Sequence, residues 1–320
     1  NTNLQGYDKD RLFGNVKISY QFNDWLSAYG RSGIDTWSHR RTEIKAVGSN
    51  QVPDGRYVED LRRFNEINHF YMLTANKTFG DFSVTASVGG QNMSQTRNRL
   101  YTQLNGLELP DLYNVSNGKS GTPNSLLSNL REERINSLLG TAQFSFRDFV
   151  FLDVSARNDW WSVLPSNNNS FLYPSASLSV VLTEALDIYS NTMSYLKLRG
   201  GWSQVGSAGV LAPYQLQQNY SFRTTPFGDK PLAFNQNTLN NPNIKPETTT
   251  GYEFGLAGRF FNNRLNLDVT YYNQASEDLI VRVEVSPTSG YKFAFQNIGR
   301  MENEGLEIQF GGNIVETRDF

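Results

Sequence analysis

The sequence predicts an all-β fold, and within that class a transmembrane antiparallel β-barrel. Large apolar residues recur at every second position over segments of about ten residues, and this is the strand length that crosses a tilted bilayer. Short and long connections also alternate between these segments along the chain. A period of two gives each strand one apolar face and one polar face, as a barrel wall between lipid and water requires.

The clearest unit is a hairpin over residues 247–274. Its first arm alternates from Tyr252 to Phe260, and its second arm alternates from Leu265 to Tyr271. Between the arms, Asn262-Asn263 tolerates left-handed backbone geometry and so predicts a two-residue turn. The same unit recurs along the whole chain, which makes this hairpin the repeat of the fold.

About eleven strands are expected from this alternation, an odd number that would cut a barrel partway. In chain order they are residues 12–22, 26–34, 67–78, 82–88, 138–146, 150–157, 173–182, 196–203, 252–260, 265–272 and 293–312.

Residues 1–320 are therefore interpreted as one partial barrel domain with five long external loops. The loops are expected at about residues 36–65, 93–134, 158–172, 206–246 and 275–291. Outer-membrane barrels have tight periplasmic turns at one end and longer external loops at the other, whereas soluble sandwiches and propellers do not segregate loops in this way. The Ser-, Asn- and Asp-rich face would then line a wet lumen, and the apolar face would contact the lipid bilayer.

Composition excludes several other classes of protein. No segment approaches eighteen consecutive apolar residues, so no transmembrane helix is predicted, and the mean hydropathy of −0.50 suits alternating barrel strands. The net charge of −2 predicts no nucleic-acid partner. The absence of cysteine excludes disulfides and thiolate metal sites. Aromatic residues make up 13% of the chain, which is enough to form interfacial girdles.

No enzyme is predicted from these residues. The two histidines, His39 and His69, have no metal-ligand spacing. Ser203 follows Gly201-Trp202 as in a nucleophile elbow, but it lies inside a predicted strand and Val205 occupies the place of the second glycine.

Binding residues are harder to assign. Trp160 and Trp161 are candidate contacts for a ligand or a lid, because indole rings stack on sugars and other flat ligands. Interfacial anchoring or loop packing is the favoured alternative for this pair. Carboxylates at Glu132-Glu133, Glu277-Asp278 and Glu302/Glu304 are predicted to be solvated, with a calcium ion in a loop as a minor alternative. No cofactor is predicted.

Several segments resemble the SusC-like (RagA-type) TonB-dependent receptors of Bacteroidota outer membranes. They are Ser155–Pro165, Phe171–Leu186, Tyr195–Ser207, Asn241–Leu256, Arg259–Asn273 and Gln296–Gln309. They cover the second half densely, whereas residues 1–134 match only in outline. The departures from the family pattern, Trp161 and residues 207–210, fall in predicted loops, so they leave the substrate open.

The resemblance implies a 22-stranded barrel with an N-terminal plug. It also implies a SusD-like surface lipoprotein as a lid, energy from TonB, and active import of oligosaccharides or peptides across the cell outer membrane. An alternative is a structural or secretion-associated barrel on the same scaffold without nutrient uptake. The chain starts at Asn1 without Met or signal peptide and stops directly after a strand, so we expect an internal fragment that lacks the plug. No individual binding residue transfers from the family.

Overall fold

The computed structural model describes residues 3–122, 124–188, 190–209, 211–223 and 226–313. The chain forms two compact units. The first comprises Asn1–Ile18, Gly30–Phe70 and Asn92–Ile135, and the second comprises Ser19–Tyr29, Tyr71–Gln91 and Asn136–Phe320. No helix in the described residues is long and apolar enough to cross a membrane.

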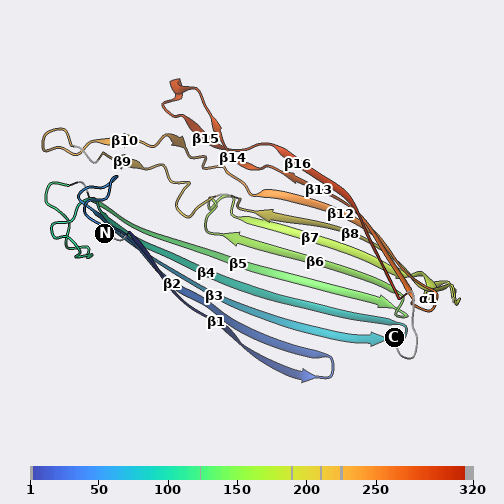
Figure 1. Ribbon diagram of the computed structural model, residues 1–320. Coiled ribbons are helices and arrows are strands. Elements are labelled where there is room, and N and C mark those ends of the chain that lie inside the picture. The colour runs from blue at the N-terminus through green and yellow to red at the C-terminus, as the bar shows by residue number, and fades with distance from the viewer. Residues whose placement is uncertain (1–2, 123, 189, 210, 224–225, 314–320) are drawn as a thin grey trace, which may run out of the picture. The chain divides into compact units, whose positions relative to one another are not determined.

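One antiparallel sheet of eleven strands dominates the structure, which confirms the all-β prediction (Figure 1). Strands that are neighbours in the sheet are also consecutive in the chain, except where residues 208–246 and 278–299 come between them. The strands are, in sheet order, β1 (Leu4–Asn23), β2 (Leu26–Lys45), β3 (Arg56–Phe79), β4 (Phe82–Leu104), β5 (Ser125–Phe146), β6 (Val150–Trp161), β7 (Ser170–Val181), β8 (Met193–Ser207), β12 (Glu247–Phe260), β13 (Leu265–Glu277) and β16 (Arg300–Gly312).

These two intervening segments, residues 208–246 and 278–299, form two small sheets of their own. The first sheet pairs β9 (Tyr220–Phe222) with β10 (Ala233–Asn235), and the second joins β11 (Thr238–Leu239), β15 (Phe293–Asn297) and β14 (Ile280–Glu284). Helical structure is limited to α1 (Leu182–Ala185) and the 3-10 turn η1 (Pro287–Ser289) within the described segments.

The tight turns of the second unit form one row at the same end of the strands. Backbone hydrogen bonds join each turn to the next strand pair, and these bonds are Asn76 N to Trp25 O (2.8 Å), Arg147 N to Asp81 O (2.9 Å), Val181 N to Phe149 O (2.8 Å) and Phe261 N to Thr192 O (3.0 Å). The connection from β7 to β8, residues 182–192, includes α1 and is longer than the other turns. The short connections therefore lie together at one end of the strands, as the alternation of short and long connections predicts.

Strand register aligns the apolar residues of the second unit on one face. One row across six strands runs Leu152, Leu178, Gly200, Phe254, Tyr271 and Leu306. The next row on the same face runs Val150, Val180, Leu198, Leu256, Val269 and Ile308. The opposite face carries Asp153, Ser177, Gly201, Glu253, Tyr272 and Gly305. The alternation read from the sequence is thus the real two-faced pattern of β6 to β16.

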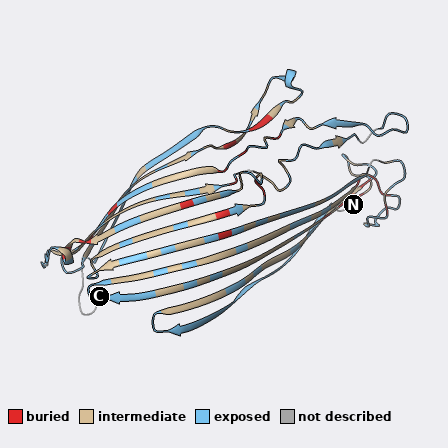
Figure 2. Cartoon of the chain, turned by 180° about the vertical axis from the view of Figure 1, so that it is seen from behind, coloured by how far each residue is buried: buried red, intermediate tan, exposed pale blue. Residues whose placement is uncertain are grey.

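The apolar face is not covered by protein. Phe254 is 58% exposed, Ile308 is 64% exposed and Phe310 is 69% exposed. Buried residues are few and lie mainly near the loop ends of the strands (Figure 2). A contiguous apolar surface of this kind marks an interaction site for lipid or protein.

Two of the expected loops are much shorter than predicted. The loop expected at 36–65 is residues 46–55, and the loop expected at 93–134 is residues 105–124, because β2 to β5 continue through the rest. These strand extensions have charged residues at successive positions, as in Arg40-Arg41, so no apolar alternation reveals them. Ion pairs between neighbouring strands hold them instead, including Arg11–Asp35 at 2.6 Å and Arg40–Glu59 at 3.0 Å.

The other predicted loops and strands differ less from the observed ones. The loop expected at 158–172 is residues 162–169, and short strands interrupt the loops expected at 206–246 and 275–291. The strand expected at 293–312 is two strands, β15 and β16, because Gly299 has a φ of +97° and breaks the extended backbone. The turn expected at Asn262-Asn263 spans residues 261–264, with positive φ at three successive residues.

Candidate functional site

The polar face of the second unit contains a hydrogen-bonded ion pair between side chains from β8 and β13. The guanidinium of Arg199 donates to both carboxylate oxygens of Asp268, at 2.9 and 2.7 Å, and to Thr270 Oγ1 at 2.6 Å. Arg199 reaches Asp268 by crossing β12 above Gly255, where an added Cβ would overlap its Nε. A glycine is required there because only a bare backbone leaves room for the side chain.

This ion pair borders a hollow of about 630 Å³ on the same face. Lys197, Asn266 and Gln309 also line it, together with Arg199 and Asp268. These groups are donors and acceptors of hydrogen bonds, with both signs of charge represented. The polar face can therefore bind a polar solute, but its lining does not select one charge.

Trp160 and Trp161, the predicted ligand or lid contacts, have different surroundings at the end of β6. Trp161 packs against a buried cluster beneath the long loops, whereas Trp160 is 39% exposed. The cluster consists of Val163, Leu164, Ala208, Ile244, Ile280 and Phe295. Loop packing therefore accounts for Trp161, which is partly buried, and Trp160 is the more exposed member of the pair. Their contact with a ligand or lid stays a prediction.

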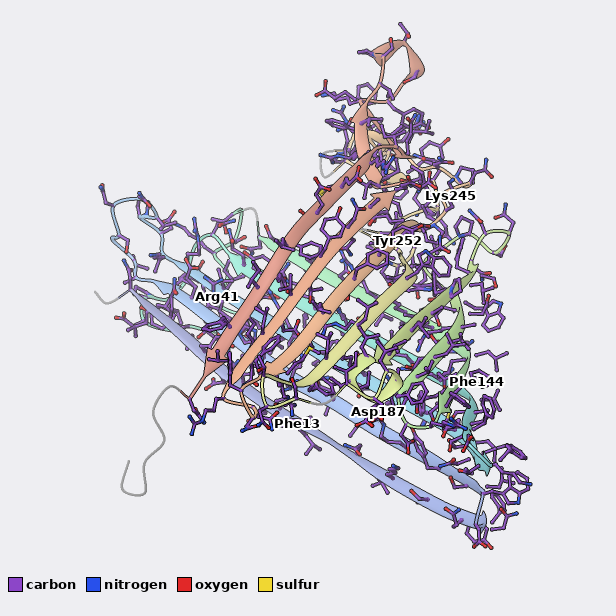
Figure 3. The ribbon with its side chains drawn as sticks, turned by 90° about the vertical axis from the view of Figure 1, so that its right-hand side faces the viewer. Phe13, Arg41, Phe144, Asp187, Lys245 and Tyr252 are labelled. Carbon is purple, nitrogen blue, oxygen red and sulfur yellow. The ribbon has the colours of Figure 1, made fainter. Side chains whose placement is uncertain are left out.

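Asn297 and Lys245, two residues that the sequence did not single out, hold the loop ends together with Asp278. Asn297 Nδ2 donates to the carbonyl oxygens of Lys245 (2.7 Å) and Asp278 (2.9 Å), and its Oδ1 accepts from Lys245 N (3.0 Å). Lys245 Nζ also pairs with Asp278 at 2.6 Å, and Lys245 lies at the loop end of β12 beyond Tyr252 (Figure 3). Lys245 and Asn297 occur in the segments Asn241–Leu256 and Gln296–Gln309, so the resemblance already pointed to both.

In the first unit, Asp60 is the centre of a buried charge cluster. Its side chain is 4% exposed and accepts hydrogen bonds from Arg62 (2.7 Å) and Arg99 (2.8 Å). Burial alone would raise the pKa of Asp60, but the hydrogen bonds from Arg99 and Arg62 outweigh it and lower the pKa to about 2. Asp60 therefore remains ionised and fixes two cations on the sheet.

Three of the six candidate calcium carboxylates are engaged with cations. Glu277 and Glu302 lie 3.5 Å from Arg300, and Asp278 pairs with Lys245. Across the described segments, no group of three or more His, Asp or Glu side chains is arranged to hold a metal ion. A calcium ion in a loop stays an expectation from the sequence. Ser203 lies within β8, opposite Ser175 and Gly251.

An open apolar face, a polar face with ion pairs and one row of tight turns together define a wall of a membrane β-barrel. The comparison with known families agrees, because residues 1–317 match the family described as "TonB dependent receptor-like, beta-barrel". The chain belongs to this family of β-barrel receptors. The family is one of receptors and transporters rather than enzymes.

Similar proteins include other TonB-dependent receptors. TonB-dependent receptor P3 of Formosa agariphila is 25% identical over 97% of this chain and 31% of its own length. TonB-dependent receptor P26 of the same organism is 28% identical over 65% of this chain and 21% of its own length. TonB-dependent receptor SusC of Bacteroides thetaiotaomicron is 28% identical over 58% of this chain and 19% of its own length. The chain spans less than a third of each of these relatives.

Solved structures share the fold. A chain of the RagAB peptide transporter superposes with a TM-score of 0.88 at 22% identity, covering 98% of this chain and 35% of that one. The siderophore receptor PiuA from Acinetobacter baumannii superposes with a TM-score of 0.57 at 15% identity, covering 97% of this chain and 45% of that one. The SusC-like (RagA-type) resemblance is thereby confirmed at the level of family and fold.

Proposed function

We propose that the protein is part of a TonB-dependent importer in the cell outer membrane, which takes up oligosaccharides or peptides. The carrying observation is the two-faced sheet of β6 to β16. Its exposed apolar face suits lipid, and its opposite face holds the Arg199–Asp268 pair and the hollow beside it. A lumen lined by such groups can hydrogen-bond a polar cargo.

Membership of the TonB-dependent receptor family supports dependence on TonB, because the family takes its name from that coupling. The similarity to SusC supports a SusD-like lipoprotein as the lid over the long loops. The similarity to the RagAB peptide transporter keeps peptides among the possible cargoes. A barrel wide enough to pass an oligomer needs a plug, so transport would be gated rather than diffusive.

The test is growth on a panel of glycans and peptides, comparing the wild type, a deletion of the gene, and a strain with TonB inactivated. We expect loss of growth on one class of polymer in both altered strains and its return when the gene is supplied again. Unchanged uptake of every polymer, together with disturbed surface assembly or secretion, would replace this proposal with the structural or secretion-associated alternative.

A further inference from the structure

A second hollow, in the first unit, has a strongly cationic lining. Its volume is about 720 Å³, and it is lined by β1 to β5. Seven of its lining residues are Lys or Arg, whereas one, Asp35, is acidic. The alternation of side chains along a strand places six of these cationic side chains on the face of the hollow and Arg63, which follows Arg62, on the opposite face. The whole chain has a net charge of −2, so this concentration of positive charge is local. A cleft lined by one sign of charge raises the local concentration of ligands with the opposite sign.

The wall of this hollow is a stack of side chains across four strands. Lys9 Nζ of β1 lies 5.1 Å from the ring of Trp37 on β2. The ring of Trp37 stacks on Phe64 of β3, with centroids 5.5 Å apart and planes 15° apart. Arg97 of β4 lies 5.6 Å from the ring of Phe64. These cation–π contacts hold two cations in place without neutralising them.

The cations of the hollow fall into two sets. Arg11 pairs with Asp35, and Arg62 and Arg99 share Asp60. The others, Lys9, Arg63, Arg97 and Arg131, form no salt bridge with any residue that the structure describes. Glu133 is near enough to Arg97 for their charges to interact, and burial raises the pKa of Glu133. With Asp35, Asp60 and Glu133 all counted as anions, six cationic side chains on this face still exceed three carboxylates, so the hollow retains uncompensated positive charge.

We propose that this hollow binds an anionic oligosaccharide, whose carboxylate or sulfate groups pair with Arg97 and Arg131. The guanidinium group is planar and donates two parallel hydrogen bonds to such oxyanions. The amide of Asn129, which also lines the hollow, can donate to and accept from sugar hydroxyls. The inference deepens the proposed import function and rests on it for the role of the ligand as cargo.

The same geometry disfavours an acidic peptide. Arginine clusters bind acidic peptide motifs as well, but a peptide is usually held in addition by apolar pockets or along a free strand edge. Here the large rings are stacked on each other and flanked by Lys9 and Arg97, so they offer no open apolar socket. Arg97 and Arg131 lie on β4 and β5, which are paired on both sides within the eleven-stranded sheet and offer no free strand edge.

The experiment measures binding by the full-length receptor that contains this chain, purified in detergent, by isothermal titration calorimetry. Four probes of similar length separate the possible ligands: oligogalacturonate, a sulfated dextran oligomer, a neutral malto-oligosaccharide and oligoglutamate. We expect the Kd of at least one anionic oligosaccharide to be about tenfold or more below those of the neutral sugar and oligoglutamate, and to rise with salt. Comparing oligogalacturonate with sulfated dextran tells which anionic group is preferred.

Variants place the binding in this hollow. The double substitution Arg97→Gln/Arg131→Gln should weaken anionic binding about tenfold or more, because it removes two charge-assisted contacts. Arg40→Gln is the matched control, because Arg40 belongs to the same unit, is exposed and does not line the hollow, and it should change the Kd less than about twofold. Circular dichroism and heat-dependent gel mobility report whether each variant is folded.

Three results would overturn the inference: equal, salt-independent binding of neutral and anionic sugars, full binding by the double variant, or tighter binding of oligoglutamate, which would indicate an acidic peptide. The import proposal is tested separately by growth of the deletion strain. If the receptor binds no anionic probe but still imports a neutral polymer, the proposed anion-binding role of the hollow is wrong and the import proposal stands. In that case the double variant should import the neutral polymer as well as the wild type does.

Discussion

The two parts of the sheet use the same backbone ladder but different side-chain forces. In β6 to β16, neighbouring strands present matched apolar rows, with Leu256 directly opposite both Leu198 and Val269. In the first unit, the described parts of β1 to β5 are tied by ion pairs such as Arg11–Asp35 and the Asp60 cluster. The matched apolar rows suit lipid on one face, whereas the ion-paired parts of β1 to β5 suit water and the charged ligand proposed above. Val16 and Ile18 of β1 lie outside those parts and are exposed apolar residues, as in the second unit.

Placing an arginine on the apolar face should produce the largest effect. We expect Leu256→Arg to lower the free energy of unfolding in lipid vesicles by about 2–4 kcal/mol, because it moves a charge into hydrocarbon. The measurement is a denaturant titration of the full-length receptor. Leu130→Arg is the matched change in the first unit, where the side chain is 53% exposed, and it should cost about 0.5 kcal/mol or less. Equal costs at both positions would remove the distinction between the two regions.

Asp60→Asn should be the most damaging substitution within the ion-pair network. It leaves Arg62 and Arg99 facing a neutral amide at a buried position, and we expect a loss of about 2 kcal/mol. Hydrogen exchange of the β3 and β4 amides around residues 60 and 99 would measure it locally. Asp54→Asn, which breaks the exposed pair with Lys119, is the control and should change exchange little.

The same carboxylate predicts a dependence on pH. The folded-state pKa of Asp60, about 2, lies below its ordinary value of 3.8. Its contribution is therefore complete above about pH 4 and is lost as the pH falls towards 2, which amounts to about 2 kcal/mol. Exchange protection near residue 60 should fall over this range in the wild type and much less in Asp60→Asn. A pH response of the same size in the variant would assign the effect to other carboxylates.

Adding a single methyl group on the polar face of the second unit should lower the stability of the protein. Gly255→Ala places a Cβ against Arg199 and should displace it from Asp268, at a cost of about 1–2 kcal/mol. Gly251→Ala is the control on the same face of β12, because its Cβ would lie 3.7 Å from Ser203 Oγ, an ordinary contact. If both variants unfold at the same denaturant concentration as the wild type, the Arg199–Asp268 pair does not contribute to stability.

Sequence reasoning succeeded where the two faces of a strand meet different surroundings. The alternation in Tyr252–Phe260 and Leu265–Tyr271 predicted both strands, because lipid-like and polar surroundings impose a period of two. It failed in residues 36–45 and 56–66, where polar and apolar residues are mixed on both faces and an ion pair such as Arg40–Glu59 joins the strands. The sequence did not predict the cationic hollow, because its residues come from five strands that only the folded sheet brings together.

The smallest effect should come from the exposed ion pair between two tight turns, Arg147–Asp81. Its N–O distance of 2.7 Å equals that of Arg62–Asp60, but the two side chains are 60% and 53% exposed. Water and salt screen such a pair, so Asp81→Asn should change the free energy of unfolding by about 0.5 kcal/mol or less. The backbone bond from Arg147 N to Asp81 O remains in the variant and keeps the turns together. A denaturant titration at low and high salt measures the difference. A loss as large as that of Asp60→Asn would show that burial does not set the strength of these pairs, because Asp81 is more exposed than Asp60 and has one arginine partner where Asp60 has two.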